Sequence, residues 1–256
     1  MDGRAWIDGL PPELERQAEL LRALLDAVER DERFRAFEVG CSLGRGNADA
    51  LSDIDVGLWV ADDAWDHTLV AVETLLDGLG SVLDSFAIDR PWGRWFFVEY
   101  VDGGQLDVAA QRASAAKGHL PDSVALLDRD GLLVERYEPA SYRADEDALR
   151  EWNFDAWFAL ANLDKYLRRG SLWEARASLE DARRSLLSLH AAAHGVPSPV
   201  FGLTSVLDTD VALPHGLEQT LAGLDAAEIR SAALALAELL DEHDPPRFAE
   251  RVRARL

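Results

Sequence analysis

Hydrophobic positions predict alternating helices and strands over the first 140 residues. Residues 10–30 place leucines and alanines at helical spacing, behind two prolines that a first helical turn tolerates. Residues 54–60 are hydrophobic on both faces, which predicts a central strand. The turn Asp102-Gly103-Gly104 predicts a hairpin between two strand-like runs. In all, we expect strands at 34–39, 54–60, 82–88, 94–100, 105–110 and 124–128, and a second helix at 62–79.

The pattern changes near residue 142, after which almost no strand-like run occurs. Helical spacing predicts helices at 147–168, 173–193 and 226–241, with a shorter one at 217–221. Gly170 and Gly195 fit the ends of the first two. We therefore expect an α+β protein with two domains. Residues 1–142 would form a mixed sheet flanked by helices, and residues 143–256 a helical bundle.

Charge and composition narrow the range of partners. The formal net charge of −21 repels nucleic-acid backbones and anionic membranes and favours cationic small molecules or basic partners. No run of 18 apolar residues predicts a membrane span, and the first 12 residues lack the features of a secretory signal. We therefore expect a cytoplasmic protein. Cys41 is the single cysteine, which excludes an intramolecular disulfide and a cysteine zinc cluster.

The stretch from Gly40 to Val56 carries the candidate chemistry. A turn with three glycines and Ser42 follows a strand, and glycine lets backbone amides approach a polyphosphate closely. A short helix expected after the turn would favour negative charge at its start. Asp53 and Asp55 enter the next strand two residues apart, so alternation puts both side chains on one face. Such neighbours repel each other unless a cation lies between them, and Mg²⁺ prefers oxygen ligands.

Asp107 is the candidate for a third acid, between two hydrophobic residues in the second arm of the hairpin. A neighbouring strand can bring it beside Asp53 and Asp55. Glu99 in the opposite arm is a rival, because the hairpin register decides which residue lies there. Three acids can hold two metal ions about 3.5–4 Å apart, which stabilises the attacking and leaving oxygens of phosphoryl transfer.

This motif resembles the DNA polymerase β-like nucleotidyltransferase superfamily, whose signature is Gly-Ser, about ten residues, then Asp-x-Asp. Ten residues separate Ser42 from Asp53 here, and the segment from Arg45 to Asp55 is similar to the branch that modifies antibiotics. The resemblance implies that Ser42 contacts nucleotide phosphates and that Asp53 and Asp55 bind magnesium. Gly40 and Arg45 complete the nucleotide-binding turn that we expect.

Cys41 departs from the family pattern. The family's Gly-Ser aligns with Cys41-Ser42, and Gly40 lies one position earlier. Cysteine is small enough for the turn to survive. A positive φ angle at position 41 would nevertheless be unfavourable for a residue with a side chain, and would put phosphate binding at risk.

The helical half resembles the helical domain of kanamycin- and lincosamide-type nucleotidyltransferases. The resemblance rests on the pattern of helices and on residues 165–170 at a helix end. It implies a domain that caps the cleft, with Lys165 as a candidate phosphate ligand and Asp164 as a candidate general base. The alternatives are a cation that favours the helix C-terminus and an acid on a solvated face. Three tryptophans either line an acceptor pocket or belong to the core: Trp152, Trp157 and Trp173.

The leading hypothesis is transfer of a nucleoside monophosphate from a triphosphate to a hydroxyl of a small molecule, with release of pyrophosphate. The resemblance implies two Mg²⁺ ions, ATP or another triphosphate as donor, and an aminoglycoside- or lincosamide-like antibiotic as acceptor. One alternative is nucleotidylation of a protein, as in antitoxins of this superfamily, and another is a nucleotide-binding module without transfer. Arg184 and His190 also resemble the catalytic pair of HEPN ribonucleases. Both a monomer and a homodimer remain open.

Overall fold

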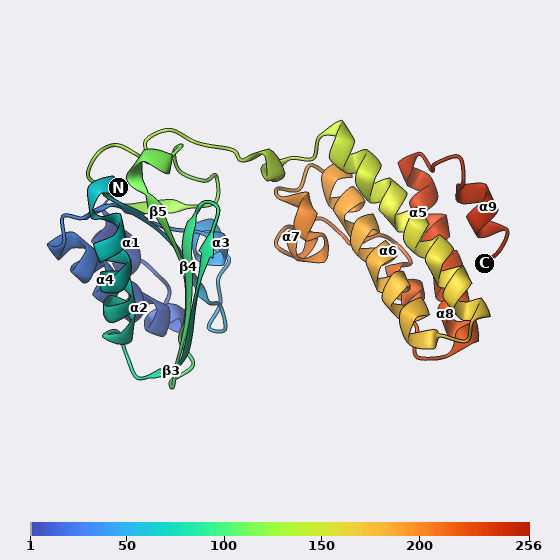
Figure 1. Cartoon of the computed structure of the whole chain (residues 1–256), viewed down its shortest axis with the longest axis horizontal. Coiled ribbons are helices and arrows are strands. Elements are labelled where there is room, and N and C mark those ends of the chain that lie inside the picture. Colours follow the sequence, from blue (N-terminus) through green and yellow to red (C-terminus); the bar gives the residue numbers. More distant parts are fainter. Residues whose placement is uncertain (1) are drawn as a thin grey trace. The chain divides into compact units, whose positions relative to one another are not determined.

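The computed structural model describes residues 2–256, which form a sheet-containing unit and a helical unit (Figure 1). The first unit ends at Glu138 and the second begins at Pro139. The first contains α1 (Gly3–Asp8), α2 (Glu15–Arg30), β1 (Phe34–Val39), α3 (Cys41–Arg45), β2 (Ile54–Val60), α4 (Trp65–Asp77), β3 (Val82–Arg90), β4 (Gly93–Tyr100), β5 (Gln105–Arg112) and β6 (Val124–Asp128). The second contains α5 (Glu146–Arg168), α6 (Leu172–Ala193), α7 (Leu203–Leu207), α8 (Ala226–Leu240) and α9 (Ala249–Arg253).

The expected α+β class is confirmed, and every predicted strand is present. The bounds of β1, β2 and β6 coincide with those that the hydrophobic pattern predicts. Three helices were not expected: α1, α7 and α9. Each of them has only five or six residues, which is too short for a helical repeat of hydrophobic positions to stand out.

The sheet has six strands in the order β3-β4-β5-β2-β1-β6. Only the pair β2 and β5 runs parallel within the sheet, and the other neighbours are antiparallel. The predicted hairpin joins β4 and β5, and the Tyr100 N–H donates to the Gly104 carbonyl across its turn at 2.8 Å. The strand β2, which is hydrophobic on both faces, lies inside the sheet, as its pattern predicts.

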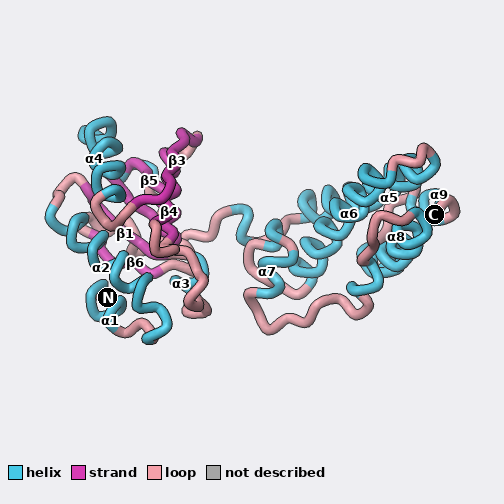
Figure 2. Tube along the Cα trace, turned by 90° about the horizontal axis from the view of Figure 1, so that it is seen from below, coloured by secondary structure: helices cyan, strands magenta, loops and turns pink. Residues whose placement is uncertain are grey.

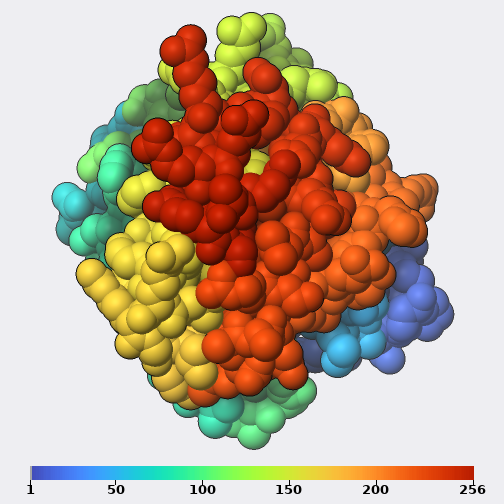
Figure 3. Space-filling model, turned by 90° about the vertical axis from the view of Figure 1, so that its right-hand side faces the viewer, coloured from blue at the N-terminus to red at the C-terminus, as the bar shows by residue number. Residues whose placement is uncertain are grey.

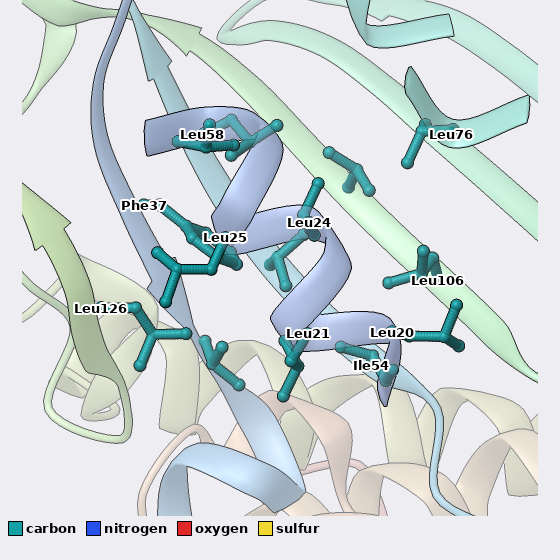
Figure 4. Packing of buried hydrophobic residues seen from close by; sticks show 14 of the residues in the cluster. Leu20, Leu21, Leu24, Leu25, Phe37, Ile54, Leu58, Leu76, Leu106 and Leu126 are labelled. Atoms are coloured by element: carbon teal, nitrogen blue, oxygen red, sulfur yellow. The ribbon is translucent and has the colours of Figure 1, made fainter. Parts of the chain in front are cut away.

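One face of the sheet carries the main core of the first unit. Helix α2 presents four leucines to it (Figure 4), and inward-facing residues of five strands pack with them, as do residues of α1, α3 and α4. The strand β2 alternates clearly: Ile54, Val56 and Leu58 point into this core, whereas Asp55 lies on the opposite face. Helices α1, α2 and α4 cover the core face, as Figure 2 shows. The acids of the candidate motif are therefore kept out of the hydrophobic layer.

The opposite face is covered in one region only. Trp59 on β2 and Ala36 on β1 form a small cluster there with Leu133, which lies in the loop after β6. Toward β4 and β5 the same face carries half-buried side chains instead, among them Trp95 and Asp107. The candidate site lies in this less covered region.

The second unit is built on the antiparallel pair α5 and α6, with α8 against both. Figure 3 shows a face of this unit, to which α8 and the C-terminal segment contribute (orange to red). Residues 139–142 belong here because the Ser198 N–H donates to the Tyr142 carbonyl at 2.9 Å. Among the helices of residues 2–256, none is both long and apolar enough to span a membrane.

Candidate functional site

The turn after β1 is fixed by backbone contacts with its neighbours. Gly40 caps α3, and its N–H donates to the Asp55 carbonyl at 2.9 Å, which ties the turn to the start of β2. A Cβ atom added at Gly44 would lie 2.2 Å from the Asp122 carbonyl oxygen, so only glycine fits there. Gly46 ends α3 in the left-handed region, with φ of 77°. Two of the three glycines are thus required by the path of the chain itself.

Cys41 has a positive φ, which a glycine at this position would take without strain. Its φ is 51°, a conformation that few residues with a side chain adopt. The residue is exposed, yet its thiol hydrogen-bonds the Asp55 carboxylate. Partial burial of the thiol and the negative charge of Asp55 raise its pKa to about 12. Cys41 therefore keeps the path of the turn and adds a neutral hydrogen-bond donor beside the acids.

Asp55 and Asp107 lie side by side on the two parallel strands. They are direct partners in the register between β2 and β5, with Ile54 and Leu106 as the preceding pair on the core face. Asp53 lies one residue before β2 and is exposed. Partial burial raises the pKa of Asp55 to about 6, with the charges of Asp53 and Asp107 adding to the effect. The three acids thus interact electrostatically as one group.

Asp107 has its own partner on the side away from β2. The indole Nε1–H of Trp95 on β4 donates to Asp107 Oδ1. Partial burial raises the pKa of Asp107, and the charge of Asp53 adds to this, while the hydrogen bond from Trp95 opposes it. The sequence motif does not include Trp95. The alternation of residues 94–100 puts it on the same face as Glu99, and that signal could have found it.

The register favours Asp107 over Glu99 as the third acid. Glu99 pairs with Gln105, and its strand β4 is separated from β2 by β5. The charges that raise the pKa of Asp55 are those of Asp53 and Asp107, and Glu99 is not among them. Asp107 is therefore the acid that the sheet brings to the pair.

The chemistry of these residues fits a divalent cation, although their side chains do not enclose one. Among residues 2–256, no group of three or more histidine, cysteine, aspartate or glutamate side chains is arranged to hold a metal ion. Three carboxylates of which two have raised pKa values are, however, a concentration of negative charge that a hard cation would relieve. Asp53, Asp55 and Asp107 are the residues that would hold such an ion.

Arg45 and Ser42 both lie on α3, the short helix that follows Gly40. Ser42 is half-buried in the first turn of this helix. The Arg45 guanidinium lies 3.8 Å from the Asp122 carboxylate, and its charge counteracts the rise in the pKa of Asp55. The turn is thus linked to Asp55 in two ways, by the Gly40 N–H on its backbone and by the charge of Arg45.

Asp164 has a structural environment in the helical unit. Its side chain is 5% exposed, pairs with Arg168 at 2.8 Å and lies 3.9 Å from the Arg255 guanidinium. This buried carboxylate is thus engaged by two arginines, an environment that matches a structural ion pair. The general-base role that the resemblance implies for Asp164 stays a prediction. Lys165 is half-buried, donates to Asn162 at 2.7 Å and lies 4.7 Å from the Tyr166 ring centre. It remains a candidate phosphate ligand.

The tryptophans of the helical unit do not share one environment. Trp157 is fully buried in the core and Trp152 packs against that core, whereas the side chain of Trp173 is exposed. They do not form a common pocket wall. Arg184 pairs with Asp181 at 3.1 Å, and the His190 ring is engaged by the Ala212 carbonyl at 2.9 Å. This arrangement gives no support to a ribonuclease pair.

Comparison with known proteins gives structural likenesses only. No family model matches the sequence, and no curated protein matches it either. An aminoglycoside 6-adenyltransferase from Bacillus subtilis is 15% identical with a TM-score of 0.37, over 92% of this chain and 89% of that chain. A nucleotidyltransferase-like protein from Exiguobacterium sibiricum 255-15 is 16% identical with a TM-score of 0.41, over 88% and 74%. A chain of the GLD-2/RNP-8 complex is 14% identical with a TM-score of 0.32, over 91% of this chain and 81% of that chain. These values are too low to transfer an activity.

Proposed function

We propose that this protein is a magnesium-dependent nucleotidyltransferase. The observation that carries the proposal is the direct register of Asp55 with Asp107 on parallel strands, with Asp53 next to them and a glycine turn at the same end of β2. When bound, divalent cations supply charge neutralisation for an entering hydroxyl and a leaving pyrophosphate. The protein itself would hold three carboxylates together at one end of β2 and place the backbone N–H groups of the turn near them.

The acids and the turn would bind different parts of a metal-bound nucleotide. The acids would bind the cation, while Ser42 and the backbone of the turn would contact the phosphates, with Arg45 supplying positive charge. This division supports positioning and electrostatic stabilisation as the source of the rate, without a covalent intermediate on the protein.

We propose ATP as the donor and a small hydroxyl compound, such as an aminoglycoside- or lincosamide-like antibiotic, as the acceptor. The net charge of −21 supports a cationic acceptor, since opposite charge favours encounter. Modification of this kind would serve antibiotic resistance in the cytoplasm. The alternatives are label transfer to a protein and nucleotide binding without transfer.

One assay separates these functions. The full chain is incubated with Mg²⁺, α-³²P-labelled ATP and a panel of aminoglycosides and lincosamides, and the labelled product is identified. We expect label on a small molecule, and a loss of about 10³-fold or more in Asp53→Asn, because removal of a metal ligand forfeits several kcal/mol of stabilisation. Label on a protein would favour nucleotidylation of a protein. Near wild-type transfer by Asp53→Asn would refute the metal assignment.

Glu99→Gln is the matched control for the acid set. It removes one carboxylate from the same sheet face but from a strand that does not adjoin β2. We expect its rate to stay within about fivefold of wild type, since surface charge alone changes encounter modestly. Asp107→Asn should lose activity as Asp53→Asn does. If Glu99→Gln lost activity and Asp107→Asn kept it, Glu99 would be the third acid.

A further inference from the structure

Trp95 connects the third acid to an aromatic cluster on the open sheet face. It lies on β4 opposite Ala109, two positions from Phe97, which pairs with Asp107. This diagonal offset lets its indole Nε1–H reach Asp107 Oδ1. Because β5 lies between β4 and β2, the hydrogen bond is on the side of Asp107 that faces away from Asp55.

The indole ring is held by its own neighbours. The Phe86 ring lies edge-on at 6.0 Å between centroids, and the Phe97 ring is tilted at 6.4 Å. The Arg90 guanidinium lies over the ring at 5.9 Å. Aromatic pairs at these separations and a cation over the face each stabilise one ring orientation. The indole N–H is therefore presented to Asp107 in a fixed direction.

We propose that Trp95 is a positioning residue, which orients the Asp107 carboxylate for a divalent cation; this rests on the proposed function. A carboxylate has two oxygens. With Oδ1 held on the β4 side, Oδ2 is left for a ligand on the side of Asp55. Hydrogen bonds to metal-binding carboxylates fix their orientation, and removal of such a partner costs about 10–100-fold in metal affinity or activity. Among the three rings of this cluster, only the indole of Trp95 carries a hydrogen-bond donor, because Phe86 and Phe97 have none.

Mn²⁺ binding to the metal-free full chain tests this without reference to activity. Free Mn²⁺ is followed by electron paramagnetic resonance during titration of wild type and of three variants. Trp95→Phe removes the donor and keeps an aromatic ring, and we expect its Kd to rise about 10–100-fold. Trp92→Phe is the matched control, since it makes the same substitution at an exposed tryptophan of the same unit, and its Kd should stay within about twofold. Asp107→Asn gives the reference for loss of the ligand.

The outcomes are separable. Weaker binding by Trp95→Phe, with kcat reduced in parallel and the acceptor KM unchanged, supports the inference. Equal or tighter Mn²⁺ binding by this variant overturns it, because the indole would then be neutral or would compete with the cation. Absence of Mn²⁺ binding by wild type would refute the proposed function itself, and this inference with it.

A second measurement applies if Trp95→Phe does not fold. In ¹⁵N-labelled wild type, one indole N–H resonance should shift on addition of Mg²⁺, and the same resonance should be displaced in Asp107→Asn. A spectrum in which no indole resonance responds to either change would overturn the inference.

Discussion

Replacement of Asp55 by asparagine should stabilise the metal-free protein while it abolishes transfer. Asp55 is held next to Asp53 and Asp107 in a partly buried position, so its charge is unfavourable without a cation. Asparagine has the same shape and can still accept the hydrogen bond from Cys41. The charge of Asp55 would thus lower the stability of the metal-free protein, and a bound cation would remove this cost.

The magnitude follows from the pKa of Asp55. Its pKa is about 6 in the folded protein, against an ordinary value of 3.8. Between these values the folded state binds a proton that the unfolded state has lost, so stability falls as the pH rises through this window. At about 1.4 kcal/mol per pH unit, the ionised carboxylate costs up to about 3 kcal/mol above pH 6. At pH 4.5 the cost is about 1 kcal/mol, because folded Asp55 is then largely protonated.

Urea unfolding in EDTA at pH 7.5 and pH 4.5 measures this difference. Asp55→Asn should unfold with a free energy larger than wild type by about 1–3 kcal/mol at pH 7.5, and the gain should shrink at pH 4.5. Asp63→Asn, at an exposed position of the same unit, should change stability by less than about 0.5 kcal/mol at both pH values. A destabilised Asp55→Asn, or a gain independent of pH, would refute the reasoning.

Three further predictions test the turn and the helical unit. Gly44→Ala should destabilise the protein by more than about 2 kcal/mol and weaken MgATP binding, because its methyl group would meet the Asp122 carbonyl. Gly40→Ala, where the added methyl group has open space, should be tolerated. Thermal melts and calorimetry measure both variants, and equal effects would contradict this prediction. Asp164→Asn should lower the melting temperature of the helical unit and leave kcat within about fivefold of wild type. Lost turnover at unchanged stability would instead show that Asp164 acts as a general base. Cys41→Gly should stabilise the turn by about 1 kcal/mol in urea unfolding and bind MgATP at least as tightly; a tenfold weaker affinity would show that the thiol is required.

Most of the sheet could be predicted because its strands are strongly patterned. The run from Ile54 to Val60 is hydrophobic on both faces, and this alone predicts its central place, which the strand order confirms. The neighbours of Asp107 could not be predicted to the same degree. Its contact with Asp55 depends on which strands adjoin, and a parallel pair leaves no short turn in the sequence to reveal it.

The remaining features depend on tertiary contacts that local patterns do not encode. The bond from Trp95 to Asp107 needs the exact hairpin register, which the sequence left open between Asp107 and Glu99. Asp164 looks like a surface acid by spacing, yet Arg255 from the C-terminal end approaches it. The motif indicates that a side chain at position 41 could strain the turn, but only the backbone shows that φ is positive there.

Anomalous diffraction from crystals grown with Mn²⁺ and a non-hydrolysable ATP analogue tests the metal assignment most directly. We predict a Mn²⁺ peak within bonding distance of carboxylate oxygens from Asp53, Asp55 and Asp107, with the analogue's phosphates at the turn beside Ser42. Ordered analogue with no anomalous peak among these acids would contradict it.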